Sequence, residues 1–181
     1  MPILKLLAVL IFFVGLFYLI IPSPSYPLPP TDSVQSLEEA DIENSEERRA
    51  YFTNFSREEV LVHYENELQK SFPFNFPSYR VSYPPEDSQT LIRDQTRSVH
   101  LPEIIHPFRE SVFVNFFEAS TAKDAISYKG IPFERKITIR YLPTAPHSRI
   151  LIILPSFLFL LYLLHELLRE LISFTKLLLK K

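Results

Sequence analysis

The sequence predicts an α+β fold, with a small helix-plus-antiparallel-sheet domain between an N-terminal and a C-terminal transmembrane helix. Two apolar runs, 6–21 and 150–164, lie near the ends of the 181-residue chain. Between them, a helix start signal at Ser56 precedes apolar residues at helical spacing. Further along, the segment 131–141 alternates apolar and polar residues, which is typical of a strand with one buried face. We therefore expect one extracytoplasmic α+β domain over 50–148.

The first apolar run contains sixteen residues without a charge. As a helix it would be about 24 Å long, which approaches the hydrocarbon thickness of a bilayer once its flanks are included. We predict a transmembrane helix over 1–21. The alternative is a cleaved signal peptide, because Ser23 and Ser25 are small residues in front of a suitable cleavage position at Tyr26.

The next segment, 22–49, is expected to be a linker in two parts. Residues 22–30 hold five prolines in nine positions, which favours an extended spacer without internal hydrogen bonds. Residues 31–49 hold seven acidic residues against two arginines. A charge run of this kind is usually a hydrated linker, here with a helix after Ser36, and an acidic docking surface for a basic partner is the alternative.

The central domain is predicted to begin with a helix over 56–70. Ser56 as N-cap and Glu59 three residues later form a capping box, in which each side chain satisfies a backbone N–H of the other residue. An apolar stripe follows at helical spacing, formed by Val60, Leu61, Tyr64 and Leu68. Pro73 then limits the length of the helix.

Three strands are predicted after this helix, over 79–83, 111–117 and 131–141. In the last strand, the residues expected to face the core are Ile131, Phe133, Ile137, Ile139 and Tyr141. Lys129 and Gly130 precede this strand, and because glycine adopts positive φ without strain, a hairpin turn is expected there.

Residues 86–110 have the least definite pattern of the domain. A short helix is expected from Glu86, whereas 101–108 is expected to be helix or loop, because Pro102 and Pro107 fit badly in the interior of an element. The sequence leaves the fold of this segment open.

The second apolar run is followed by apolar residues at helical spacing and by basic residues at the end of the chain. We predict that 149–181 forms a transmembrane helix that continues into an amphipathic basic tail. This tail is expected to lie along the membrane interface, where Lys176, Lys180 and Lys181 meet anionic head groups. A buried helix of a soluble domain is the alternative.

Three polar residues, His165, Glu166 and Arg169, mark the predicted membrane boundary of this helix. Glu166 and Arg169 are three residues apart on one helix face, so they can form an ion pair that anchors the helix at the interface. Binding of a neighbouring membrane protein is the alternative role for the same charges.

The charges near the first apolar run predict the orientation in the membrane. Lys5 and the N-terminal amine precede this run, whereas no Lys or Arg follows it before Arg48. The positive-inside rule therefore predicts a cytoplasmic N-terminus and a central domain outside the cytoplasm. The second helix returns the C-terminus to the cytoplasm, so the chain is expected in a plasma or inner membrane.

The composition excludes several classes of site. The chain has no cysteine, which rules out disulfides, thiolate metal sites and cysteine nucleophiles. Its two glycines, Gly15 and Gly130, are too few for a glycine-rich phosphate loop. A formal net charge of −2 provides no basic patch for nucleic acid. No cofactor is expected, and the expected partners are the lipid bilayer and either a membrane protein or a second copy of the chain.

The candidates for catalysis are His100, Glu103 and His106. A zinc protease helix needs two histidines four residues apart with a glutamate between them as the base. Here the histidines are six residues apart, and Pro102 lies between them. On a strand they would share one face while Glu103 pointed away. Solvated or locally hydrogen-bonded histidines are therefore the favoured interpretation, and a metal or acid–base site is the alternative.

Four segments carry a resemblance to known sequences: TNFSREEVLVHYENEL, IRDQTRS, EIIHPFRESVFVNFFEA and FERKITIRYLP before a terminal span. They are similar to segments of uncharacterised two-span membrane proteins of small-genome bacteria. The resemblance implies the two-helix layout described above and brings no catalytic residues with it.

We expect from these patterns a two-span integral membrane protein whose domain is a non-catalytic accessory, assembly or scaffold subunit of an envelope complex. One alternative is a membrane-tethered hydrolase that uses His100, Glu103 and His106. The other is a ligand-sensing membrane protein. The sequence specifies neither a ligand nor an oligomeric state.

Overall fold

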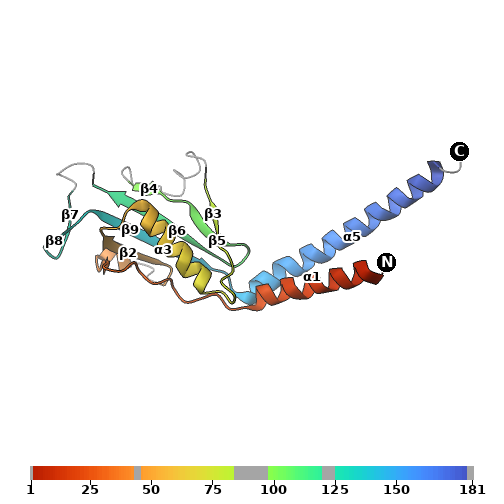
Figure 1. Ribbon diagram of the computed structural model, residues 1–181, viewed down its shortest axis with the longest axis horizontal. Helices are drawn as coiled ribbons and strands as arrows, with labels where there is room; N and C mark the ends of the chain where they lie inside the picture. Colours follow the sequence, from red (N-terminus) through yellow and green to blue (C-terminus); the bar gives the residue numbers. More distant parts are fainter. Residues whose placement is uncertain (1, 43–45, 84–97, 120–124, 179–181) are drawn as a thin grey trace. The chain divides into compact units, whose positions relative to one another are not determined.

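The computed structural model describes residues 2–42, 46–83, 98–119 and 125–178 of the chain (Figure 1). The chain divides into two compact units. One unit is helical and consists of Met1–Pro22 and Ala145–Lys181, and the other is the domain Ser23–Thr144. The domain combines helix with antiparallel sheet, so the predicted α+β class is confirmed.

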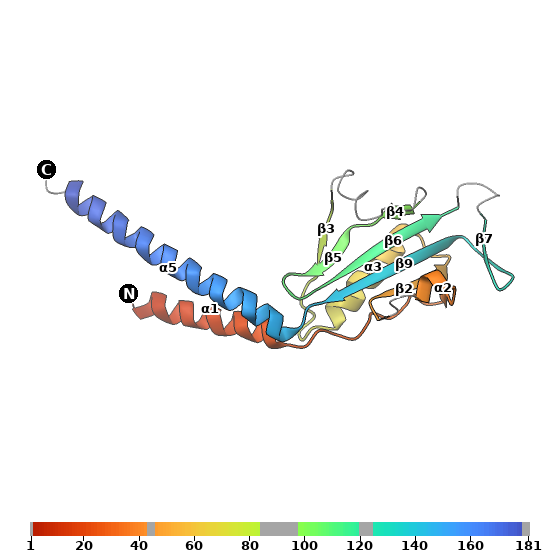
Figure 2. The same cartoon turned by 180° about the vertical axis from the view of Figure 1, so that it is seen from behind.

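The helical unit is a pair of helices, α1 (Pro2–Ile20) and α5 (Pro146–Leu178), that lie side by side in Figures 1 and 2. Phe12 of α1 and Phe157 of α5 contact each other, with ring centroids 5.7 Å apart. Exposed leucine, isoleucine, valine and phenylalanine side chains cover much of the outer surface of both helices.

Arg149, in the first turn of α5, joins the two helices. Its guanidinium donates hydrogen bonds to the carbonyl oxygens of Leu19 and Ile21, at 3.2 and 2.8 Å. A helix end leaves its last carbonyl groups without intrahelical partners, and it favours a nearby positive charge. The end of α1 is therefore capped by a side chain from the start of α5.

One segment of the described chain, Pro146–Glu170, is a helix long and apolar enough to cross a membrane. In α1 the apolar stretch is shorter, Val9–Ile20. Composition and helix length thus support a single span and do not show the predicted pair of spans.

The domain contains a seven-stranded antiparallel sheet in the order β1-β2-β9-β6-β5-β3, with β4 also paired to β6. Strands β7 and β8 form a separate two-stranded sheet. The strands are β1 (Val34–Gln35), β2 (Arg48–Thr53), β3 (Tyr79–Val81), β4 (Ser98–His100), β5 (Glu103–His106), β6 (Glu110–Glu118), β7 (Ile126–Tyr128), β8 (Ile131–Phe133) and β9 (Arg135–Pro143).

The hydrophobic core lies between this sheet and α3 (Arg57–Lys70), which crosses one face of the sheet (Figure 1). On the sheet side, strands β6 and β9 supply most of the core residues. These two strands pair from Glu110 opposite Pro143 to Glu118 opposite Arg135. The core residues are Tyr51, Val60, Leu61, Tyr64, Leu68, Leu101, Ile104, Val112, Val114, Phe116, Ile137, Ile139 and Tyr141. Alternate residues of each strand contribute, because successive side chains point to opposite faces of a sheet.

The predicted helix is confirmed, including its first turn. Ser56 is the N-cap of α3, and both halves of the capping box with Glu59 are present. The Ser56 hydroxyl donates to the Glu59 carboxylate at 2.7 Å, and the Ser56 backbone N–H donates to it at 2.8 Å. These two bonds, the first more than the second, hold the pKa of this exposed carboxyl below its usual range. The four residues of the predicted apolar stripe are the buried residues of the helix.

The segment predicted as one strand over 131–141 forms two strands, β8 and β9, with Glu134 between them. Strand β8 lies in the two-stranded sheet, and the chain joins the main sheet only with β9. Strand β8 pairs with β7 through the predicted turn, in which Lys129 and Gly130 have φ values of 53° and 79°. The hairpin packs its aromatic rings on Phe52 of β2. Ile131 is consequently 55% exposed, although the alternation predicted that it would face the core.

The segment 101–108, for which helix or loop was expected, contains strand β5, and β4 precedes it. Pro102 lies in the short connection between the two strands, where its missing N–H breaks no ladder hydrogen bond. The short helix expected from Glu86 lies outside the described residues.

The proline-rich half of 22–49 was expected to be a spacer, but it lies on the α3 side of the sheet. The Tyr26 hydroxyl donates to the carbonyl oxygen of Ile139 at 2.8 Å, and the Arg49 guanidinium lies 4.1 Å from the centre of the Tyr26 ring. Tyr141 donates in turn to the carbonyl oxygen of Pro24 at 3.0 Å. Proline favours the extended backbone as predicted, but the partly buried Tyr26 makes residues 23–30, which we call the proline-rich strap, part of the domain.

The acidic half of the same segment is also folded onto the domain. It forms β1 and the one-turn helix α2 (Glu39–Ile42), which Figure 2 shows on the side of the sheet opposite α3. Asp41 is buried, accepts a hydrogen bond from Ser36 at 2.6 Å and pairs with Lys136 at 2.7 Å. The helix predicted after Ser36 is present, but the segment is packed on the domain and is not a purely hydrated linker.

Candidate functional site

The sheet separates the three residues that the sequence put forward for catalysis. His100 pairs with Asn115 of β6, and His106 pairs with Glu110 of the same strand. Residues directly opposite each other in a ladder point to the same face, and positions 110 and 115 differ by an odd number. The two histidines therefore lie on opposite faces, about 17 Å apart along the strand.

The predicted geometry, in which the two histidines share a strand face, is thus wrong. That geometry required a continuous strand from His100 to His106, but Leu101 and Pro102 interrupt it and change the face to which the following side chains point. A single metal or acid–base site formed by all three residues is not assembled. Among the described residues, no group of three or more His, Cys, Asp or Glu is arranged to hold a metal ion.

His100 and Glu103 come together on the face opposite α3. The Tyr83 hydroxyl donates a hydrogen bond to the Glu103 carboxylate, and the Tyr83 and His100 rings are 6.3 Å apart. The bond to Glu103 and partial burial raise the pKa of Tyr83 to about 12. Burial lowers the pKa of His100 and outweighs the opposing effect of the Glu103 charge. His100 is thereby favoured in its neutral form at pH 7.

His106 belongs to a different, fully buried cluster on the α3 face, at the turn between β5 and β6. Its Nδ1 lies 2.7 Å from Oε1 of Glu110, and its Nε2 lies 3.3 Å from the carbonyl oxygen of Phe76. Arg109 donates to the same Glu110 oxygen at 3.4 Å, and the Ser23 hydroxyl donates to the other oxygen at 2.9 Å. We call these residues, Ser23, His106, Arg109 and Glu110, the buried polar cluster.

The buried polar cluster is organised around one carboxylate. Burial alone would raise the pKa of Glu110, but the hydrogen bond from His106, the charge of Arg109 and the bond from Ser23 outweigh it, so that pKa lies below its usual range. Both ring nitrogens of His106 lie within hydrogen-bonding distance of an oxygen, one from the Glu110 carboxylate and one from the Phe76 carbonyl group.

This arrangement is structural rather than catalytic. The Ser23 hydroxyl donates to a carboxylate and not to the histidine that would act as its base. The side chains of His106 and Glu110 have no exposed surface, so a substrate cannot reach them. The cluster fixes the two ends of the domain. Ser23 is the first residue of the domain, and the backbone N–H of Thr144, the last residue, donates to the carbonyl oxygen of Arg109 at 2.8 Å.

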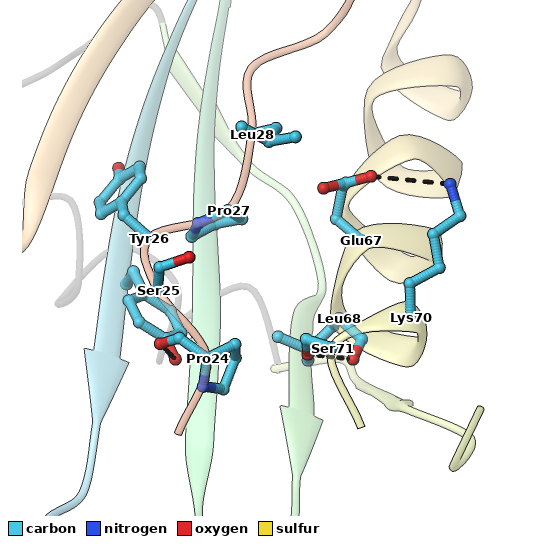
Figure 3. Close-up of a pocket in the computed structure, with 10 residues that line it drawn as sticks. Pro24, Ser25, Tyr26, Pro27, Leu28, Glu67, Leu68, Lys70 and Ser71 are labelled. Atoms are coloured by element: carbon cyan, nitrogen blue, oxygen red, sulfur yellow. Dashed lines mark hydrogen bonds and ion pairs between the residues drawn. The ribbon is translucent and has the colours of Figure 1, made fainter. Parts of the chain in front are cut away.

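A groove lies between the proline-rich strap and the second half of α3, with a volume of about 260 Å³ (Figure 3). It is lined by Pro24, Ser25, Tyr26, Pro27, Leu28, Glu67, Leu68, Lys70, Ser71 and Tyr141. Several of its polar side chains already have partners within the protein: Glu67 pairs with Lys70 at 3.7 Å, and the Ser71 hydroxyl donates to the carbonyl oxygen of Leu68. The groove therefore has the walls of a shallow apolar cleft rather than of a reaction site.

The predicted boundary residues of the C-terminal helix all lie on α5. His165 and Arg169 are exposed and Glu166 is half-buried, and an Arg169 nitrogen lies 3.4 Å from a Glu166 carboxylate oxygen. This is the ion pair expected from their spacing. The side chain of Lys176 and the whole of Lys180 and Lys181 lie outside the described residues.

Two exposed phenylalanines were missed by the sequence analysis. Phe74, in the turn after α3, is 98% exposed, and Phe108, in the turn between β5 and β6, is 74% exposed. Both have left-handed backbone conformations, with φ values of 66° and 62°. A large side chain is uncommon in this region, and the sequence gives no sign of it because the usual glycine is absent.

No family model matches the chain, and no curated protein or solved structure matches it. The resemblance to two-span proteins therefore stays a prediction.

Proposed function

We propose that the chain is a two-span integral membrane protein that presents its domain, Ser23–Thr144, outside the cytoplasm as a non-catalytic accessory, assembly or scaffold subunit of an envelope complex. Its partners in this proposal are the bilayer and a membrane protein or a second copy of the chain. The observation that carries the proposal is the contact of Arg149 with the end of α1.

That contact supports a helical hairpin rather than an independent leader helix. A signal peptide that is cleaved after α1 would lose the two carbonyl groups to which Arg149 donates. A retained α1 of nineteen residues is about 28 Å long, close to the thickness of the hydrocarbon layer. The whole of α1, rather than its apolar stretch Val9–Ile20 alone, is thus long enough to cross the bilayer beside α5.

The outer surfaces of the pair support the same conclusion. Leu10, Phe13 and Phe17 of α1 and Leu151 and Phe159 of α5 are among many exposed large apolar side chains. In water, contiguous apolar patches of this kind mark a binding surface or an aggregation site. In lipid they are the ordinary surface of a spanning helix, whose backbone groups are satisfied within the helix.

A binding role for the domain is favoured over the hydrolase alternative by the geometry of the histidines. His100 and His106 lie on opposite faces of the sheet, and His106 is engaged in the buried polar cluster. The domain does present exposed edges and a groove, which are features through which a small domain contacts another protein.

The topology can be tested with single cysteines because the natural chain has none. Ser127→Cys, at an exposed position of β7, should react with a membrane-impermeant maleimide on intact cells that express the full chain. A cysteine added after Lys181 should react only after the membrane is permeabilised. Reaction of the added cysteine in intact cells with protection of Ser127→Cys would reverse the orientation, and extraction of the chain by alkaline carbonate would exclude both spans.

The hairpin itself can be tested with Arg149→Met. This change removes both donors to the end of α1, and charged hydrogen bonds of this kind contribute about 1.5 to 3 kcal/mol each. In the Phe12→Cys, Phe157→Cys background, a short bismaleimide should join α1 and α5 efficiently, and Arg149→Met should reduce the yield. Arg169→Met is the matched control, because Arg169 contacts Glu166 of its own helix. Equal yields in the two variants would contradict the role of Arg149.

Co-purification then tests the subunit role. The tagged full chain, solubilised from its native membrane in a mild detergent, should carry a stoichiometric membrane-protein companion or a second copy of itself. A homogeneous monomer without a companion would contradict the proposal of a subunit while leaving the topology intact.

A further inference from the structure

The exposed pair Phe74 and Phe108 is held on two adjacent turns. Phe72 and Phe76, on either side of Phe74, have ring centroids 5.8 and 5.9 Å from the His106 ring. His106 in turn precedes the turn that carries Phe108, and the backbone N–H of Arg109 donates to its carbonyl oxygen at 3.0 Å. The buried bases of both turns are thus packed together, while their two tips are exposed.

The backbone at these tips is held in an unfavourable conformation. Phe74, Asn75 and Phe108 all have left-handed φ values, which non-glycine residues seldom adopt. Such conformations persist where the surrounding contacts determine them, and they cluster at sites that bind something. Here the result of the strained conformation is that two phenylalanines point away from the core rather than into it.

These turns lie at the end of the domain where the chain enters and leaves. Ser23 donates to Glu110, and Thr144 donates to the carbonyl oxygen of Arg109, which is next to Phe108. Thr144 is two residues from Pro146, the first residue of the candidate span. Chain length alone, for any arrangement of the two units, keeps the Phe108 backbone within about 17 Å of Pro146.

The tips have the composition of a membrane-contacting surface. The segment 71–77 reads SFPFNFP and contains no charge, and Pro107 precedes Phe108. Lys70, at the end of α3, has an exposed side chain next to this segment and can meet a lipid phosphate. Aromatic residues are enriched where a protein meets the head-group layer, because burial of the ring there is favourable and the neighbouring backbone stays hydrated.

We propose that Phe74 and Phe108 form a lipid anchor that inserts into the head-group layer of the bilayer crossed by α1 and α5. This inference rests on the proposed two-span function. It assigns the two turns a ligand, the lipid surface, and it fixes which end of the domain faces the membrane. A second protein chain that covers the same rings is the competing outcome.

The test uses the absence of tryptophan from the chain. Phe74→Trp and Phe108→Trp each create a single fluorescent reporter in the full-length protein, reconstituted in phosphatidylcholine and phosphatidylglycerol liposomes. When the lipids carry bromine on their acyl chains near the head groups, both reporters should lose at least half of their emission. A third reporter, Phe159→Trp, lies on an exposed position in the middle of the candidate span. Its quenching in liposomes whose lipids carry bromine near the ends of the acyl chains shows whether the helix has inserted.

Ile131→Trp is the matched control for exposure. Ile131 is 55% exposed and precedes the start of β9, at the end of the sheet opposite to Thr144. The sheet register separates the two ends of β9 by about 27 Å. The Ile131→Trp reporter should keep its emission in brominated liposomes.

The outcomes separate this inference from the proposal on which it depends. If Phe159→Trp is quenched and neither turn reporter is, the spans are inserted and the lipid anchor is refuted. If Phe159→Trp is not quenched, the two-span proposal fails and the anchor fails with it. Turn reporters whose emission is shifted to the blue without quenching would mean that protein covers the rings, which also overturns the anchor.

A second measurement covers the case in which a tryptophan disturbs a turn. Phe74→Cys and Phe108→Cys should react slowly with a water-soluble maleimide in liposomes and rapidly after the lipid is replaced by a small detergent with a short head group. Ser127→Cys should react equally fast in both. Equal rates for the turn cysteines in liposomes and detergent would contradict lipid contact.

Discussion

Glu110 shows how a single carboxylate can organise the end of a domain. It is buried with no exposed side-chain surface, and it accepts hydrogen bonds from His106, Arg109 and Ser23. A buried charge is tolerated only when its lone pairs are satisfied and opposite charges lie near it. Each of these donors comes from a part of the chain that reaches this end of the sheet, so the carboxylate fixes their mutual positions.

Glu110→Gln should therefore destabilise the domain by about 3 kcal/mol at pH 7, because it leaves the buried Arg109 guanidinium without its counter-ion. Urea unfolding of the full chain in detergent, followed by tyrosine fluorescence, measures this change. Glu118→Gln is the matched control, since Glu118 lies at the other end of β6 and makes an exposed ion pair with Arg135. That variant should stay within about 0.5 kcal/mol of the natural chain.

The pH dependence of the same variant has a definite sign. The pKa of Glu110 in the folded domain is below the ordinary value of 4.5. The charged carboxylate therefore contributes stability that is present above pH 4.5 and is lost as the pH falls through the lower, folded-state pKa. The difference in stability between the natural chain and Glu110→Gln should shrink below pH 4.5, and a constant difference from pH 7 to 3 would contradict the assignment.

The hairpin of β7 and β8 is the element whose stability depends most directly on one turn. Its central residues, Lys129 and Gly130, both have positive φ, as two-residue hairpin turns of this hand require. A Cβ atom added at Gly130 would meet nothing within 4 Å. The consequence of a substitution there is therefore conformational and not steric.

Gly130→Ala should weaken the hairpin by about 1 kcal/mol, whereas Lys129→Gly should strengthen it by about 0.5 kcal/mol, because glycine occupies the left-handed region without strain. Hydrogen exchange at the β7–β8 pairs measures both effects. Exchange should be faster in the first variant and slower in the second, while β6 and β9 keep their protection. A change of the same sign in both variants would show that another interaction controls the turn.

Elements with local signals could be predicted from the sequence, and elements defined by distant partners could not. The capping box of Ser56 and Glu59 and the alternation over 135–141 act within one element, so α3 and β9 were predicted. In β2, four successive residues, 50–53, are buried, because the strap and α3 cover one face and the β7–β8 hairpin covers the other. A strand buried on both faces has no alternation to recognise.

The candidate site was less predictable than the fold for the same reason. His100, Glu103 and His106 are close in sequence, but the break at Leu101 and Pro102 decides which face each side chain occupies. The buried polar cluster joins Ser23 to Glu110, which are 87 positions apart. The exposure of Phe74 and Phe108 depends on backbone conformations that their residue types do not indicate.

At the scale of the whole molecule, the proline-rich strap makes the domain larger than the sequence signals of α3 and β9 indicate. The Tyr26 hydroxyl is bonded to β9, and burial raises the pKa of Tyr26 far above its ordinary range, with the neighbouring Tyr51 adding to the shift. Pro27 and Pro30 are also buried. The strap covers a part of the sheet that α3 leaves open.

A fragment of residues 23–144 should therefore fold on its own, whereas a fragment of 46–144 should lose at least about 3 kcal/mol, because the Tyr26 ring and its hydrogen bond are removed. Thermal unfolding monitored by circular dichroism compares the two fragments. A control fragment in which Thr31 is replaced by Ala keeps the strap and should unfold with 23–144, since Thr31 is exposed and does not have a positive φ. Equal stability of the fragments 23–144 and 46–144 would mean that residues 23–45 are a spacer that does not stabilise the domain.

The chain enters the domain at Ser23 and leaves it at Thr144, and both residues are tied to the adjacent pair Arg109 and Glu110. A domain whose ends meet in this way can be gained or lost as a cassette, because a short turn could replace it without lengthening the path between the two helices. Arg149 would still cap the end of α1 in such a shortened chain. The helical pair and the domain can therefore diverge separately in evolution, with the first retained while the second is exchanged.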